Sequence, residues 1–149
     1  MATAATAKHA NKQQDIRALF DRYHHAWESA DADAIAALHS SDSTFWLQDG
    51  SPRIQGRETL RKHYTGLFAQ YGRFGWDIQR VMFGDRHWVF EYDMLIEMKD
   101  CNQQPFTARV PMLDIVDVND AGEVTRKDVY VDGVARRAAL ERAGLVSAS

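Results

Sequence analysis

Apolar side chains first recur at steps of three and four residues between Gln13 and Ala30, the spacing of one helical face. That face consists of Ile16, Leu19, Phe20, Tyr23 and Trp27. Asp31 has a side chain suited to capping a second, short helix, which carries Ile35 and Leu38. The turn-forming run from 40 to 42 is expected to end it. The chain therefore opens with two helices that meet at Asp31.

A short hairpin and a third helix are predicted next. Thr44 to Gln48 is typical of a strand, Asp49 to Pro52 of a turn, and Arg53 to Gln55 of a short return strand. Helical spacing resumes from Arg57 to Tyr71, and Gly72 follows as a terminator. The apolar side of this helix carries Leu60, His63, Tyr64, Leu67 and Phe68.

Beyond Gly72 the pattern changes to long extended segments separated by turn residues. These segments are Arg73 to Phe83, His87 to Lys99, Pro105 to Val118 and Glu123 to Asp132. They predict an antiparallel meander. The alternation is clearest in the second segment, His87 to Lys99. Its apolar residues face one side of the strand, and mostly acidic residues face the other. The apolar set is Trp88, Phe90, Tyr92, Met94, Ile96 and Met98. A last helix is expected from Val134 to Ala143.

Length and charge narrow the class of protein. A chain of 149 residues fits one domain. Its formal net charge of -3 offers no basic field for phosphates, which argues against nucleic-acid binding. Cys101 is the only cysteine, so no internal disulfide is possible, and a reducing cytoplasm fits best. No segment approaches the roughly 20 apolar residues of a membrane span. We expect a flexible leader over 1–12 and a single domain over 13–146.

Three helices followed by a bent antiparallel sheet resemble the NTF2-like, or SnoaL-like, superfamily, with its ketosteroid isomerases, polyketide cyclases and limonene-epoxide hydrolases. The segments that carry the resemblance are HHAWESADADAIAALHSSDSTFWL, RIQGRETLRKHYTGLF, and GEVTRKDVYVD running into RRAALERAGLV. The resemblance implies an α+β fold, a cone-shaped barrel in which N-terminal helices pack in a strongly curved antiparallel sheet. It also implies a cavity used for cofactor-free proton transfer, and homodimers formed through the outer sheet face.

Only some of the catalytic residues known in these families have a counterpart in this chain. Tyr23 matches the oxyanion tyrosine of ketosteroid isomerases, but their base position falls on Leu47 and their oxyanion aspartate on Leu113. The last aspartate of limonene-epoxide hydrolases aligns with Val129. A one-residue bulge would instead turn Asp128 inward, because a register shift of one exchanges the two faces of a strand. The resemblance thus argues against a ketosteroid isomerase and leaves the hydrolase open.

The same resemblance implies that the side chains of Arg109 and Lys127 point toward an apolar cavity. Burial lowers the pKa of a lysine, which makes Lys127 a candidate base or an anchor for an enolate, unless it is solvated. Asp114 would enter the cavity only if its strand were bulged, and otherwise faces the dimer side. Asp49 is a candidate carboxylate near the mouth, although Asp before Gly is ordinary turn chemistry. His63 is a candidate acid or base, with a structural role as the alternative.

Together these residues predict a site for a small aromatic or otherwise apolar oxygenated molecule. The catalytic candidates are Tyr23, Lys127, Arg109, Asp49, Asp114 and His63. The substrate-binding candidates are Trp27, Leu47, Tyr64, Phe90, Tyr92, Leu113 and Val129. No metal or other cofactor is expected. The favoured function is a lyase or isomerase acting by elimination or retro-aldol cleavage, because cations stabilise enolates. The alternatives are an epoxide hydrolase and a non-catalytic binding dimer.

Overall fold

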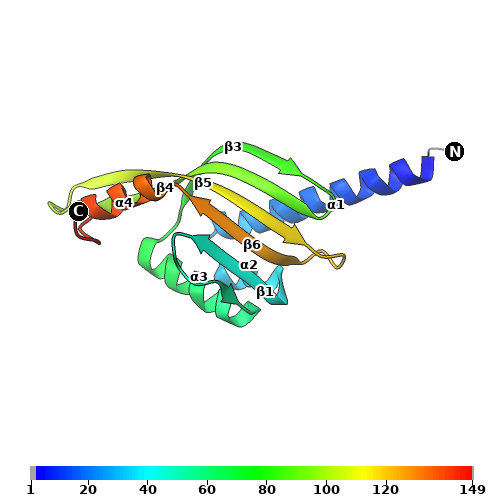
Figure 1. The fold of residues 1–149 in the computed structure, drawn as a ribbon, viewed down its shortest axis with the longest axis horizontal. Coiled ribbons are helices and arrows are strands. Elements are labelled where there is room, and N and C mark those ends of the chain that lie inside the picture. The colour runs from blue at the N-terminus through cyan, green and yellow to red at the C-terminus, as the bar shows by residue number, and fades with distance from the viewer. Residues whose placement is uncertain (1–2, 149) are drawn as a thin grey trace.

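The computed structural model describes residues 3–148 and places one curved sheet beside the helices (Figure 1). The helices are α1 (Thr3–Glu28), α2 (Ala32–Ala37), α3 (Arg57–Tyr71) and α4 (Gly133–Arg142). The strands are β1 (His39–Gln48), β2 (Ile54–Gln55), β3 (Gly75–Phe83), β4 (His87–Lys99), β5 (Pro105–Val118) and β6 (Val124–Val131). Their order in the sheet is β2-β1-β6-β5-β4-β3. The predicted α+β class and the meander from β3 to β6 are confirmed.

The predicted bounds of α3, β4 and β5 agree with the structure, whereas the turn predicted after α2 and the start predicted for the first helix were wrong. The run from 40 to 42 does not form a turn but lies within β1, which begins at His39. Pairing of His39 with Val124 on β6 and a register irregularity before Thr44 accommodate these polar residues in the strand. The first helix begins at Thr3, inside the segment expected to be a leader, and residues 4–9 are exposed. Met1 and Ala2 lie outside the described residues.

The core lies between α1, α3 and the concave face of the sheet. The predicted apolar stripe of α1 is buried from Ile16 to Trp27. Phe20 makes edge-on contacts with the rings of Phe83, Trp88 and Phe90 at 5.2 to 5.5 Å between centroids. Alternation along β4 supplies the rings of Trp88 and Phe90, and β3 supplies Phe83. The sequence pattern that predicted β4 therefore also builds part of the wall of the core.

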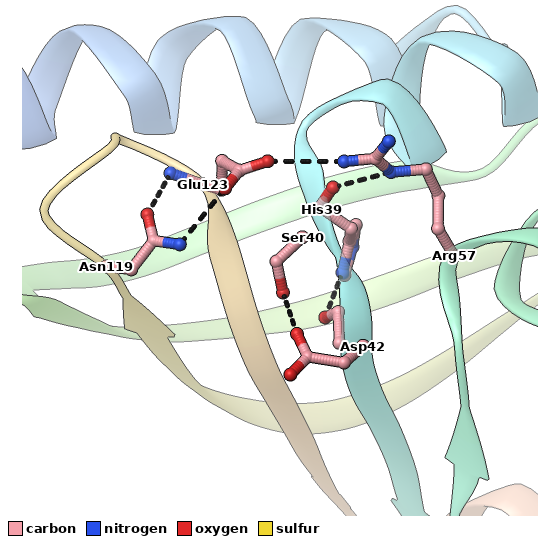
Figure 2. Close-up of polar contacts among 7 residues, drawn as sticks. His39, Ser40, Asp42, Arg57, Asn119 and Glu123 are labelled. Carbon is pink, nitrogen blue, oxygen red and sulfur yellow. Dashed lines mark hydrogen bonds and ion pairs between the residues drawn. The ribbon is translucent and has the colours of Figure 1, made fainter.

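A polar network ties α3 to the neighbouring ends of β1 and β6 (Figure 2). The Arg57 Nε donates to the main-chain oxygen of His39 at 2.8 Å, and Arg57 Nη2 lies 3.2 Å from Glu123 Oε2. Asn119 holds Glu123 through a side-chain donor at 3.1 Å and accepts its main-chain N–H at 2.9 Å. Because Glu123 immediately precedes β6, the network positions the strand that carries Lys127.

The helix α4 lies along the projecting end of β4 and β5 (Figure 1). Asp132 caps it by accepting the N–H groups of Val134 and Ala135 at 3.0 Å, and its own N–H donates to the Pro111 oxygen. At the other end, the Arg142 guanidinium lies 4.1 Å from the centre of the Phe106 ring. Both ends of α4 are therefore held against β5. Within residues 3–148 no helix is long and apolar enough to span a membrane.

The Arg57 network yields a stability prediction. Arg57→Gln should lower the free energy of unfolding by about 1–2 kcal/mol, because it removes a charged donor from a buried strand end. Arg61→Gln is the matched control on the same helix, since Arg61 pairs with Glu58 and Asp33 at the surface. That loss should be about 0.5 kcal/mol or less. Urea unfolding measures both, and equal losses would contradict the role given to Arg57.

Candidate active site

A cavity lies between the concave face of the sheet, α1, α3 and α4. Its volume is about 1020 Å³, counting the part that opens to solvent. Aromatic and aliphatic side chains form most of its wall. The predicted binding residues Trp27, Leu47, Phe90, Tyr92 and Val129 all line it. The cavity therefore resembles a small-molecule site, in which a few polar groups orient an otherwise apolar ligand.

Two of those polar groups are a buried ion pair. The Lys127 Nζ lies 3.2 Å from Asp114 Oδ2, and the two side chains are only 5% and 4% exposed. The Tyr92 hydroxyl donates to the other carboxylate oxygen, Oδ1, at 3.0 Å. The Lys127 ammonium also lies over the rings of Trp27, at 4.2 Å, and Tyr23, at 5.2 Å. Both charges are thus compensated inside an aromatic enclosure.

The electrostatics of the pair follow from burial and mutual attraction. Burial raises the pKa of Asp114, and the nearby Lys127 and Tyr92 only partly offset this effect. Burial acts to lower the pKa of Lys127, but Asp114 and Tyr23 together outweigh this effect, so the pKa lies above its ordinary value. The pair therefore presents a protonated amine beside a carboxylate more basic than an exposed one.

The register of β5 corrects three sequence-based expectations. Asp114 pairs with inward-facing Phe90 and faces the cavity in a regular strand, so no bulge is needed to bring it inward. Leu113, expected inward, pairs with Glu91 and Tyr130 on the outer face. Arg109 is also on that face, because it lies an odd number of residues from Asp114. It is half-exposed and pairs with two aspartates, Asp77 at 2.6 Å and Asp93 at 2.8 Å.

On β6 the structure decides between Lys127 and Asp128. Lys127 and Val129 point inward, as the family register implied. Asp128 lies on the outer face, where Arg126 Nη2 contacts its carboxylate at 2.6 Å. An inward Asp128 would require a bulge, and β6 runs in regular register with β1 from Arg126 to Tyr130.

Tyr23 is joined to a buried relay that the sequence did not suggest. Its hydroxyl lies 2.9 Å from His39 Nε2, and His39 Nδ1 lies 2.7 Å from Ser43 Oγ. Burial, with smaller effects of Lys127 and Arg57, lowers the pKa of His39 to about 3. Burial raises the pKa of Tyr23. At neutral pH the relay is therefore an uncharged tyrosine, histidine and serine beside the cavity.

The remaining candidates lie at the edge of the cavity or behind its wall. His63 lines the cavity next to the Phe45 ring, and burial lowers its pKa. Tyr64 is fully buried and packs edge-on against Trp27, so it supports the wall. Asp49 is not among the cavity-lining residues, because it accepts the Ser51 N–H at 2.9 Å and lies 3.3 Å from Arg136. Burial acts to raise the pKa of Asp49, but these partners lower it.

His24 lines the cavity and was missed as a site residue. Its ring stacks on Phe20 and contacts Phe90 and Trp76 edge-on. Its Nε2 lies 2.9 Å from Glu28 Oε1, but the geometry does not meet the criteria for a hydrogen bond. Burial lowers the pKa of His24, against the opposing effect of Glu28. Its spacing of four from Phe20 and three from Trp27 could have placed it on the buried face.

Among residues 3–148, no three His, Cys, Asp or Glu side chains gather as metal ligands.

The buried His39 yields a prediction of pH dependence. Because its pKa is depressed in the folded state, the unfolded chain binds the extra proton between about pH 6.5 and pH 3, and acidification destabilises the fold. The His39→Gln variant cannot titrate there. Its free energy of unfolding should therefore fall less steeply over this range, by up to about 1.4 kcal/mol per pH unit. Urea unfolding at several pH values measures the slopes, and parallel curves would contradict this account.

Solved structures share this fold at low sequence identity. A candidate SnoaL-like polyketide cyclase from Shewanella putrefaciens superposes with a TM-score of 0.74 at 12% identity, over 84% of each chain. A protein with a ketosteroid isomerase-like fold from Catenulispora acidiphila, in complex with trimethylamine, gives 0.69 at 19% identity, over 86% of this chain and 93% of that one.

An epoxide hydrolase/cyclase-like enzyme of pyran ring formation in salinomycin gives a TM-score of 0.68 at 13% identity, over 82% of this chain and 94% of that one. No curated protein sequence matches this chain. The model of the SnoaL-like domain matches residues 20–127, which is most of the sequence. The chain therefore belongs to the SnoaL-like domain family, with the NTF2-like fold that its structure displays.

Proposed function

We propose that this protein is an enzyme that transfers a proton on a small, largely apolar carbonyl compound, as a lyase or isomerase. The observation that carries the proposal is the buried pair of Asp114 and Lys127 on the wall of an apolar cavity. Perturbed acids and bases in a cavity are typical of catalytic sites. Membership of a family that includes cyclase-like and isomerase-like proteins supports the same class of chemistry.

The two members of the pair have complementary roles. The Lys127 ammonium donates a hydrogen bond to the carbonyl oxygen and stabilises the negative charge that develops there. The Asp114 carboxylate is the base that removes the proton. In isomerisation and elimination this proton leaves a carbon next to the carbonyl, and in retro-aldol cleavage it leaves the β-hydroxyl. All three routes pass through an enolate, which the same ammonium stabilises.

Substrate binding should activate the base. In the structure Lys127 and Tyr92 each contact one oxygen of Asp114. A substrate oxygen that binds the ammonium competes with the carboxylate for its positive charge. Since the opposite charge holds the pKa of Asp114 down, weakening that contact makes the base stronger. Neutral His39 has a tautomer that donates its Nε2–H to the Tyr23 oxygen, 2.9 Å away. In that tautomer Tyr23 keeps its own proton, and we propose that it donates a second hydrogen bond to the substrate.

The epoxide hydrolase alternative is less well supported. The limonene-epoxide hydrolase pattern requires an aspartate pointing inward from the last strand. In this chain Lys127 has that orientation, and Asp128 pairs with Arg126 on the outer face. A non-catalytic binding module is the second alternative, and the following experiment separates it from an enzyme.

The catalytic proposal is tested by turnover of enones and β-hydroxy ketones in deuterated water, followed by NMR. Asp114→Asn should lower kcat by about 10²–10⁴-fold, the usual contribution of a positioned base. Lys127→Met should also lower kcat, because it removes the stabilising charge. Arg109→Gln is the control, since Arg109 lies on the outer face and should leave turnover unchanged.

Thermal unfolding of each variant shows whether it is folded. Ligand-dependent melting shifts with neither product nor deuterium incorporation would indicate the binding module. Full activity of folded Asp114→Asn would contradict the assignment of the base.

We also propose that the outer sheet face forms a homodimer. Val89, Leu113, Ile115 and Tyr130 are register neighbours there, with Ile115 38% and Tyr130 45% exposed. Ion pairs border this apolar patch, among them Arg126–Asp128 and Arg80–Glu91. An apolar centre with a charged rim is the usual composition of a protein interface.

This interface predicts a change of oligomeric state. Ile115→Arg should convert a dimer to a monomer, because it replaces apolar surface at the centre of the patch with a long charged side chain that dimerisation would have to remove from water. Val134→Arg is the control at an 83% exposed apolar position on α4. Size-exclusion chromatography with light scattering reports the mass. A wild-type monomer, or a dimer that survives Ile115→Arg, would overturn the proposal.

A further inference from the structure

We infer that the substrate has two parts: a flat, unsaturated carbonyl head beside Asp114 and Lys127, and an aliphatic chain that extends beneath α4. The inference rests on the proposed function, because the ion pair is what locates the head. It goes further by assigning a ligand class to the part of the cavity that takes no part in proton transfer.

The head is assigned from the aromatic surroundings of the ion pair. Trp27 and Tyr23 face the ammonium, and the rings of Phe90 and Tyr92 stack at 4.4 Å between centroids. Each of these side chains is buried, so packing restricts its orientation. Flat, immobile ring faces match a planar conjugated group better than a bulky saturated one.

The chain is assigned from a change in lining along the same strands. On β4 the inward residues pass from Phe90 and Tyr92 to Met94, Ile96 and Met98. On β5 they pass from Asp114 to Met112 and Val110. The helix α4 adds Ala139, Leu140 and Arg136, and the Arg136 guanidinium is paired with Asp49 at 3.3 Å. Methionine is unbranched and adaptable, so these walls suit a flexible chain rather than one rigid shape.

The placement of α4 distinguishes this part of the cavity from ordinary core. The structure describes every residue of α4, and none of them is buried. The helix is held at its ends, by Asp132 with Pro111 and by Arg142 with Phe106. Between these ends Ala139 and Leu140 line the cavity while remaining half-buried. The middle of α4 thus covers the cavity without filling it.

The length of the lined strand sets the length of the chain. From Met94 to Met98 the strand advances roughly 13 Å, at about 3.3 Å per residue. With carbon–carbon bonds of about 1.5 Å, an extended chain of about ten carbons spans that distance. Each added methylene should strengthen binding by up to about fourfold until the chain passes Met98.

The test uses straight-chain enones whose tails run from much shorter to longer than about ten carbons. Dissociation constants come from quenching of tryptophan fluorescence, since Trp27, Trp76 and Trp88 line the cavity. Turnover of the same compounds is followed in parallel. Affinity should rise with tail length and then level off.

Two variants on α4 locate the chain. Ala139→Trp should reduce the affinity for long tails to that for short ones and leave the shortest enone unaffected. Val134→Trp is the matched control on the exposed side of the same helix. Leu140→Phe is a smaller obstruction, used with melting curves in case the larger one disturbs the fold, and should weaken only the longest tails.

Affinity independent of tail length, or equal weakening of short and long enones by folded Ala139→Trp, would overturn the inference. If turnover still depended on Asp114 in that case, the proposed function would stand without it. If affinity depended on tail length but no enone were turned over, the result would support the chain site and contradict the proposed function.

Discussion

The burial of Lys127 is the constraint on which the rest of the structure depends. An isolated ammonium in an apolar interior costs several kcal/mol, and a well-placed partner must offset that cost. Asp114 is this partner, on the adjacent strand and with almost no exposed surface. A slip of one residue would turn both charges outward and bring Leu113 and Asp128 into the core. The ion pair and the β5–β6 register therefore require each other.

Several other contacts make sense as support for this pair. Arg57 and Glu123 hold the start of β6, and Tyr92 satisfies the second oxygen of Asp114. Buried ion pairs are often no more stabilising than apolar residues of the same volume. Stability alone thus gives little reason for charges at this position, whereas the proposed role of Asp114 as a base does. Asp114 and Lys127 are therefore charged residues at core positions, where apolar residues are usual, and such exceptions are expected at functional sites.

The sequence predicted elements better than orientations. On β4 the inward positions are all apolar and the outward positions mostly acidic, so one pattern identified both the strand and its inward face. On β5 both faces are apolar, with Val110, Met112 and Val116 inside and Pro111, Leu113 and Ile115 outside, so alternation cannot choose between them. Charge compensation could have identified the inward face of β5. An inward Lys127 needs a nearby anion, and on the adjacent strand β5 only an inward Asp114 supplies one. The contact between His39 and Tyr23 joins residues 16 positions apart in sequence, and no local pattern reveals it.

The same constraint explains why the cavity has two different ends. Charge stabilisation requires donors and charges that are already in place, which the packed rings around Lys127 provide. Recognition of an apolar chain requires only surface to cover, and methionine side chains provide it without fixed geometry. Because α4 contacts the chain end and contributes nothing to the ion pair, substitutions at Ala139 or Leu140 change the lining without disturbing the β5–β6 register. Under the proposed function, substrate range and proton transfer would therefore depend on separable parts of one cavity.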